Sequence, residues 1–186
     1  FCGYNRYLMA DRIWSKLSPV PSGLRRAIAN GITSVSPKNW NSLLNPVGRM
    51  LGSGNQTRNW GDKLHKGANV LAVNSLEDLY LGLVSHWNDP AAMVIGSYER
   101  NSLVNGAAPD LPGLDGIQRM MALDAMTYLP DDILVKVDRA GMGVSLEGRV
   151  PFLDHRVVEF AWRLPQSLKI RDGQSKWILR QVLYKY

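Results

Sequence analysis

Cysteine is scarce in this sequence: Cys2 is the only one among 186 residues. A single thiol excludes an internal disulfide framework and is typical of proteins in reducing compartments. Long apolar runs are also missing, since stretches such as residues 91–95 are only a few residues long and a membrane-spanning helix needs about 20. The chain does not open on a basic segment followed by an apolar one. We therefore expect a cytoplasmic protein that does not engage a membrane.

Several familiar catalytic motifs are absent. The three histidines, at positions 65, 86 and 155, lie far apart, without His-x-x-x-His or Cys-x-x-Cys spacing, so we expect no metal site. The phosphate loop Gly-x-x-x-x-Gly-Lys-Ser/Thr, the dinucleotide fingerprint Gly-x-Gly-x-x-Gly and the hydrolase elbow Gly-x-Ser-x-Gly are missing too. The net charge of +6 comes from scattered residues and not from a stripe, which makes nucleic-acid binding the least favoured function.

Helical spacing of apolar residues runs through most of the chain. A stripe of Leu76, Leu79, Tyr80, Leu83, Val84 and Trp87 predicts one core-facing helix. Asn74 or Ser75 is the expected N-cap of this helix. The expected N-caps of two later helices are Asp154 and Ser175. Other helices are expected over 5–16, 23–34, 37–44, 60–73, 117–128 and from 129 onward, with loops at 48–56 and 105–116. No stretch alternates as a strand does, so the pattern predicts a mainly α fold.

Charge is unusually regular between residues 128 and 180. Asp132 and Lys136 lie four apart, as in a helical ion pair. Glu147, Arg149, Asp154 and Arg156 flank residues 150–153, an apolar segment that we expect to be buried. A buried charge needs a partner, so these four side chains either form a structural network or contact a ligand.

Three segments in this region resemble one known family. Residues 128–140 are similar to a segment that, in the family, precedes the motif Leu-Glu-x-Arg-x-Pro-Phe-Leu-Asp. Residues 146–154 match that motif, and residues 176–180 match a Lys-x-Ile-Leu-Arg helix. The opening residues 1–4 resemble the family's aromatic-Gly-Gly-Tyr segment. The family is the glutamine-dependent asparagine synthetases and their relatives, which include carboxylate-amidating enzymes of polysaccharide gene clusters. Residues 17–112 match only loosely.

The resemblance implies a fold and a chemistry. It implies the helical C-terminal part of an α/β ATP-pyrophosphatase-type domain. In such enzymes ATP activates a carboxylate as an acyl-adenylate, and ammonia from a glutaminase domain then forms the amide. Lys176 stands where the family has a lysine that contacts phosphate or the developing oxyanion. The resemblance makes Asp138, Arg149, Asp154 and Arg180 supporting residues of the ATP and substrate site.

Parts of the family pattern are not present in residues 1–186. The pyrophosphate loop Ser-Gly-Gly-x-Asp-Ser, the acidic pair for Mg²⁺ and the glutaminase domain are missing. We therefore expect residues 1–186 to be one fragment of the synthetase domain, inactive alone, whose partners are its own upstream glutaminase and pyrophosphate-loop regions and a small carboxylate. ATP and Mg²⁺ would belong to the full-length enzyme, with neither firmly bound by this part. An exposed apolar face would favour self-association.

Other interpretations stay open at this point. The chain could be a non-catalytic helical module for binding or assembly, or it could amidate a sugar carboxylate and not aspartate. Cys2-Gly3 imitates the start of the family's glutaminase domain, whose nucleophile is an N-terminal cysteine. Such a nucleophile uses its own free amino group, whereas Phe1 precedes Cys2, so we do not expect Cys2 to act in that way.

Overall fold

The computed structural model describes residues 1–50, 59–85, 87, 89–104, 106 and 109–186. The chain divides into two compact units: a middle unit, Arg12–Asn88, and a terminal unit, Phe1–Asp11 with Asp89–Tyr186. Among the described residues, helices account for all regular structure except one short two-stranded ribbon. The predicted mainly α fold is therefore confirmed. None of the described helices has the length and apolar character that crossing a membrane requires.

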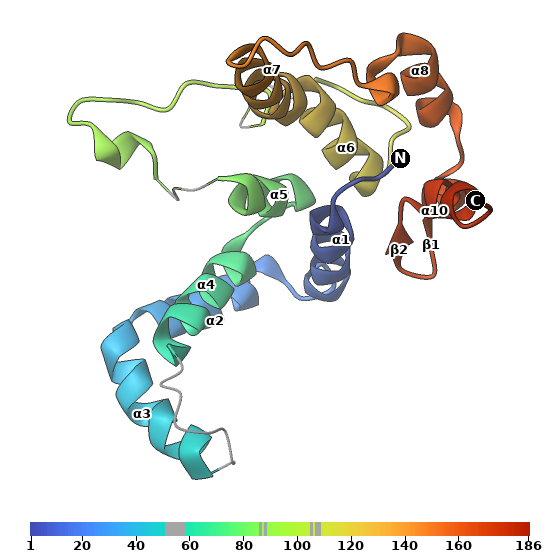
Figure 1. The fold of residues 1–186 in the computed structure, drawn as a ribbon. Helices are drawn as coiled ribbons and strands as arrows, with labels where there is room; N and C mark the ends of the chain where they lie inside the picture. Colours follow the sequence, from blue (N-terminus) through green and yellow to red (C-terminus); the bar gives the residue numbers. More distant parts are fainter. Residues whose placement is uncertain (51–58, 86, 88, 105, 107–108) are drawn as a thin grey trace. The chain divides into compact units, whose positions relative to one another are not determined.

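The middle unit is built around α4 (Trp60–Ala72), which packs against α2 (Ser22–Thr33) and α3 (Pro37–Met50) (Figure 1). Helix α1 (Asn5–Leu17) begins in the terminal unit and ends in this one. Gly61 allows the close approach of α4 to α3, because a Cβ there would lie 2.0 Å from the carbonyl oxygen of Pro37. Any side chain at this position would push the two helices apart.

Two expectations for the middle unit are wrong in part. Helix α3 was expected to end near residue 44, yet it continues through Pro46 to Met50. Proline removes one backbone hydrogen bond, and the contact of α3 with α4 offsets that loss. Residues 51–56 of the expected loop lie outside the described residues. Helix α5 (Leu76–Val84) starts at the predicted cap Ser75 but ends before Trp87, which is 59% exposed and outside the core.

Arg25 is a buried structural residue of the middle unit. Its side chain is 4% exposed, and its guanidinium donates to three backbone carbonyls. Nε reaches Val20 O at 3.0 Å, while Nη1 reaches Leu71 O at 3.2 Å and Val73 O at 2.5 Å. The last two carbonyls lie at the C-terminal end of α4, where helix carbonyls lack partners. Arg25 therefore ties α2 to the end of α4.

The terminal unit contains the remaining elements. They are a 3₁₀ turn (Ala91–Met93), α6 (Gly116–Met126), a π-helical turn (Leu129–Leu134), α7 (Val135–Met142), a second 3₁₀ turn (Pro151–Leu153), α8 (His155–Arg163), α9 (Gln166–Lys169), strands β1 (Ile170–Arg171) and β2 (Gln174–Ser175), and α10 (Trp177–Leu183). Asp115 and Gln118 form a capping box at the start of α6. The predicted cap Asp154 is confirmed, because its carboxylate accepts from the Arg156 backbone N–H at the start of α8.

The ribbon of β1 and β2 was not predicted. Ile170 pairs with Ser175 and Arg171 with Gln174, and the turn residues Asp172 and Gly173 have φ of 52° and 74°. Two-residue strands are too short to display alternation, although Asp-Gly is a known hairpin signal. The prediction of Ser175 as the cap of α10 is wrong. Ser175 is buried in β2, and Lys176 holds the N-cap position with φ 57°.

The clamp made by Arg25 gives a test of the middle unit. Replacing Arg25 by Ala leaves three carbonyls without their charged donor, so we expect the free energy of unfolding to fall by about 3 kcal/mol. Arg26→Ala is the matched control, because Arg26 is the next residue and is exposed. Urea unfolding followed by circular dichroism measures both. Equal losses in the two variants would contradict the assigned role of Arg25.

Candidate functional site

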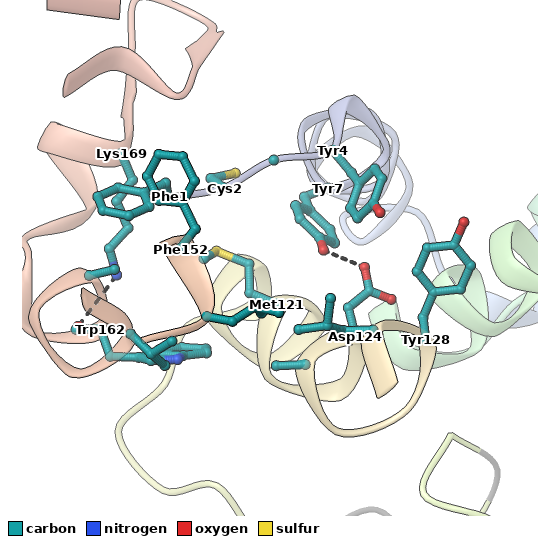
Figure 2. Close-up of a pocket in the computed structure, with 16 residues that line it drawn as sticks. Phe1, Cys2, Tyr4, Tyr7, Met121, Asp124, Tyr128, Phe152, Trp162 and Lys169 are labelled. Carbon is teal, nitrogen blue, oxygen red and sulfur yellow. Dashed lines mark hydrogen bonds between the residues drawn. The ribbon is translucent and has the colours of Figure 1, made fainter. Parts of the chain in front are cut away.

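A pocket of about 210 Å³ lies within the terminal unit. It is lined by residues before and at the start of α1, by one face of α6, by the start of the π-helical turn, by the second 3₁₀ turn, by α8, and by Lys169 at the end of α9. Figure 2 shows Tyr7, Asp124 and Tyr128 at one end of the pocket and Phe1, Phe152, Trp162 and Lys169 at the other. The two ends therefore differ in charge, with a carboxylate at one and an ammonium at the other.

The carboxylate end is organised by Asp124, which is 4% exposed. Its carboxylate accepts hydrogen bonds from the Arg6 guanidinium and from the Tyr7 hydroxyl. The guanidinium carbon of Arg6 lies 4.4 Å from the ring centroid of Tyr4 and 4.7 Å from that of Tyr128. Cation–π contacts of this kind favour a partly desolvated guanidinium. The charges of Arg6 and Asp124 compensate each other, so this end of the pocket is close to neutral.

The ammonium end is organised by Lys169, whose exposed fraction is 0%. Its Nζ donates to the Trp162 carbonyl oxygen at 3.4 Å and lies 5.4 Å from the Trp162 ring centroid. Phe1 and Phe152 form an edge-to-face pair, 5.7 Å between centroids, beside it. Burial lowers the pKa of Lys169 because desolvation disfavours the charged form, while Cys2 and Asp115 act in the opposite direction.

Cys2 lies in the wall of the same pocket and is 1% exposed. Burial raises the pKa of its thiol to about 11, chiefly by desolvation. A nucleophilic cysteine needs the opposite shift, because the thiolate is the reactive form. The environment of Cys2 therefore argues against a nucleophilic role, in agreement with the interpretation of the sequence.

The π-helical turn lies between α6 and α7, and its residues line two different hollows. Wide turns of this kind are rare and often occur at functional sites. Tyr128 and Leu129, at its start, line the pocket described above. Pro130 and Leu134 line a second hollow instead, together with Asp138 of α7 and residues Gly148, Val150 and Leu153 of the 146–154 segment. The structure thus brings Asp138 and that segment together, although neither Asp138 nor Gly148 reaches the first pocket.

The 146–154 segment crosses α7 closely. A Cβ on Gly141 would lie 2.8 Å from the Leu146 carbonyl oxygen, so glycine is required at this crossing. Contrary to expectation, residues 150–153 are not buried: Val150 is 43% exposed and Phe152 54%.

The charges around these residues form two separate local pairs. Arg149 pairs with Glu147 at 3.0 Å and Arg156 pairs with Asp154 at 2.7 Å. The Arg156 side chain, through its hydrogen bonds to Asp154, lowers the pKa of that carboxyl. Because both pairs join residues two positions apart, they stabilise local turns, and the structure contains no network among the four side chains.

Lys176 lies beside the opening segment of the chain. Its Cε is 3.7 Å from the position that a Cβ on Gly3 would occupy, and Gly3 lines the pocket. Arg180, on the next turn of α10, donates from Nε to the Ser175 carbonyl oxygen at 3.1 Å. Arg180 therefore fixes the end of the ribbon that precedes Lys176. None of the five predicted site residues is among the described residues that line the pocket.

The sequence interpretation missed Lys169 and Asp124, although each has a recognisable signal. Asp124 is the lone acid in the apolar run of residues 120–126, and Lys169 stands between Leu168 and Ile170. A single charge surrounded by apolar neighbours on an element indicates a buried, partnered group. Among the described residues, no group of three or more His, Cys, Asp or Glu side chains has the geometry to hold a metal ion.

Comparison with known proteins identifies relatives of this chain. The family model for asparagine synthase matches residues 1–186. The chain is 42% identical over 71 residues to asparagine synthetase [glutamine-hydrolyzing] 3 of Bacillus subtilis, which is 38% of the chain and 12% of that relative. It is also 48% identical over 71 residues to a putative asparagine synthetase [glutamine-hydrolyzing] of Mycobacterium tuberculosis. That match covers 38% of the chain and 11% of the relative. The chain thus spans only a small part of these relatives. No solved structure matches it significantly.

The buried thiol gives a pH-dependent test. A pKa of about 11 in place of 9.0 lowers the thiolate fraction of folded Cys2 at pH 8 by about 100-fold. We expect iodoacetamide to label the folded protein at least that much more slowly than the urea-unfolded protein, with Cys2→Ala as the blank. Because the unfolded thiol loses its proton first, Cys2 also makes the fold less stable as the pH rises from about 9 to about 11. Equal labelling rates in the two states would contradict the burial of Cys2.

Proposed function

Because the chain belongs to the asparagine synthase family, we propose that it forms part of an ATP-dependent amide-forming synthetase. In this reaction ATP adenylates a substrate carboxylate with release of pyrophosphate, and ammonia then attacks the acyl-adenylate. The proposal assigns to this chain the cationic group that offsets charge developing on the phosphate or on the acyl oxygen. Such charge offset is commonly the largest contribution to catalysis of this type.

The observation that carries the proposal is the backbone of Lys176. This residue is in the left-handed region, with φ 57° and ψ 32°, at the N-cap of α10. A non-glycine residue in this region is strained, and strain of this kind clusters at functional sites. A lysine at a helix N-terminus also opposes the helix dipole. Both features disfavour a lysine on stability grounds, so they support a functional reason for Lys176.

The surroundings of Lys176 suit a contact with a polyphosphate. Its side chain is exposed and extends over Gly3, where no side chain competes for space. An ammonium on a flexible stem is a mobile point charge that can follow oxygen atoms as bonds change. We assign Lys176 this role, and we assign Arg180 a positioning role through its bond to the Ser175 carbonyl.

We assign the other predicted supporting residues a structural role. Asp138 faces the second hollow, and Asp154 and Arg149 hold the turns at either side of residues 150–153. The exposed apolar atoms of Val150 and Phe152 are available to pack against the substrate-binding and pyrophosphate-loop regions that family members carry. Those regions and the glutaminase are the proposed partners of this chain.

Aspartate is the proposed substrate, because the relatives that match the chain are named asparagine synthetases. Amidation of a sugar carboxylate is the second candidate, since residues 17–112 match the family motifs only loosely. ATP and Mg²⁺ are the proposed cofactors of the full-length enzyme, because the family is ATP-dependent. The free, buried state of Cys2 fits the proposed cytoplasmic location.

Replacing Lys176 by glycine separates function from stability. Glycine adopts the left-handed conformation freely, so we expect Lys176→Gly to raise the free energy of unfolding by about 1 kcal/mol. The same change removes the ammonium, so ATP–pyrophosphate exchange by the full-length protein with aspartate should fall by about 100-fold or more. The two quantities therefore move in opposite directions in a single variant.

Asp172→Gly is the matched control for this experiment. Asp172 is also in the left-handed region, with φ 52°, four residues earlier in the ribbon turn. This variant should gain a smaller stability increment, because aspartate tolerates the region better than lysine, and it should keep full exchange activity. Exchange that survives in Lys176→Gly would refute the role of Lys176. A folded wild-type protein without exchange on aspartate or on uronic acids would favour the non-catalytic binding module.

A further inference from the structure

Within the part of the chain that the structure describes, the buried ammonium of Lys169 has no ionic partner in the pocket it lines. No carboxylate lies within ion-pair distance of it among the described residues, and its one hydrogen bond, to the Trp162 carbonyl, is long at 3.4 Å. An ammonium has three N–H donors. The Lys169 side chain is 0% exposed, and a buried charge without a close counter-ion is costly. An anion that entered the pocket would therefore gain an unusually strong interaction.

The other residues at the Lys169 end of the pocket favour a ligand with an apolar body. The ammonium lies 5.4 Å from the Trp162 ring centroid, and Phe1 and Phe152 line the same pocket. The volume of about 210 Å³ exceeds the roughly 150 Å³ of an engineered cavity that holds benzene. A phosphate ester, with two charges and several oxygens to satisfy, would leave most of its acceptors unpaired against these rings. A single carboxylate presents one charge to one ammonium.

The opposite end of the pocket does not compete for the same ligand group. Asp124 is already bonded to Arg6 and Tyr7, so its end of the pocket is close to neutral, whereas the other end carries the Lys169 ammonium. This polarity orients an entering acid with its carboxylate at Lys169 and its body toward Met121 and Tyr128. We propose that this pocket binds a small monocarboxylic acid with an apolar or aromatic body, anchored by the buried Lys169 ammonium between Trp162 and Phe152.

This site is separate from Lys176 and goes beyond the proposed synthetase activity, because binding here needs neither ATP nor adenylation. The two lysines flank the ribbon of β1 and β2, yet only Lys169 lines the pocket. A structural role for Lys169 is the competing explanation: the Trp162 carbonyl lies in the last turn of α8, where a lysine can cap the helix. Ligand binding and thermal stability distinguish the two roles.

The test uses phenylacetate and its neutral isostere 2-phenylacetamide, titrated into the full-length protein without ATP by calorimetry or NMR. Wild type should bind phenylacetate at least about tenfold more tightly than the amide, since a hydrogen bond between charged groups is worth that much. Lys169→Met keeps the length and apolar stem of the side chain. It should lose this preference while its melting temperature stays equal or rises. Lys136→Met, at an exposed lysine paired with Asp132, should behave as wild type.

A second variant locates the ligand. Ala125 lines the pocket and is exposed, so Ala125→Phe should fill the space and abolish binding of both compounds without burying a new group in the core. The proposal is overturned if wild type does not bind phenylacetate, if the amide binds equally well, or if Lys169→Met keeps the preference. It is also overturned if Ala125→Phe still binds. ATP–pyrophosphate exchange, measured separately, can fail or succeed without affecting any of these outcomes.

Discussion

The terminal unit depends on how the buried carboxylate of Asp124 is compensated. Asp124 lies on α6 in an otherwise apolar run, and its partners Arg6 and Tyr7 lie almost 120 positions earlier, at the start of α1. A buried carboxylate without such partners costs several kcal/mol, so the first turn of α1 must stay against α6. That constraint fixes residues 1–4 as a wall of the pocket, and it places Gly3 where Lys176 extends over it.

A second constraint acts at the other end of the unit, where the ribbon holds Lys176 in a strained conformation. A strained backbone conformation persists only where several surrounding interactions hold it in place. Here the antiparallel pairing of Ile170 with Ser175 fixes the residue before Lys176, and the Arg180 side chain binds the carbonyl of that same residue. Helix α10 fixes the residues after it. Lys176 therefore cannot relax without the loss of hydrogen bonds on both sides.

Local signals in the sequence predicted the parts of this arrangement that depend on neighbouring residues. Ser75 and Asp154 cap helices as expected, and Asp132 pairs with Lys136, because caps and four-residue pairs need no distant partner. The end of α3 was mispredicted, because packing of α3 on α4 overrides the effect of Pro46. The exposure of residues 150–153 was also mispredicted, because an apolar motif does not by itself show which residues pack against it. Asp124 and Lys169 each stand alone among apolar neighbours, a local signal that predicts burial, but the pocket they share is completed by residues 1–7, which lie far away in the sequence.

The geometry of the ribbon also explains why the side chains of Lys169 and Lys176, at its open end, point in different directions. Because Ile170 pairs with Ser175, the backbones of Lys169 and Lys176 come together one position further along. Directly opposed like charges on a ribbon are destabilising. The left-handed backbone of Lys176 breaks the pairing at this point, so that its side chain runs over Gly3 while the Lys169 side chain enters the pocket. The strained backbone of Lys176 thus places one ammonium in water, where it suits a polyphosphate, and leaves the other in the pocket wall, where it suits a single carboxylate.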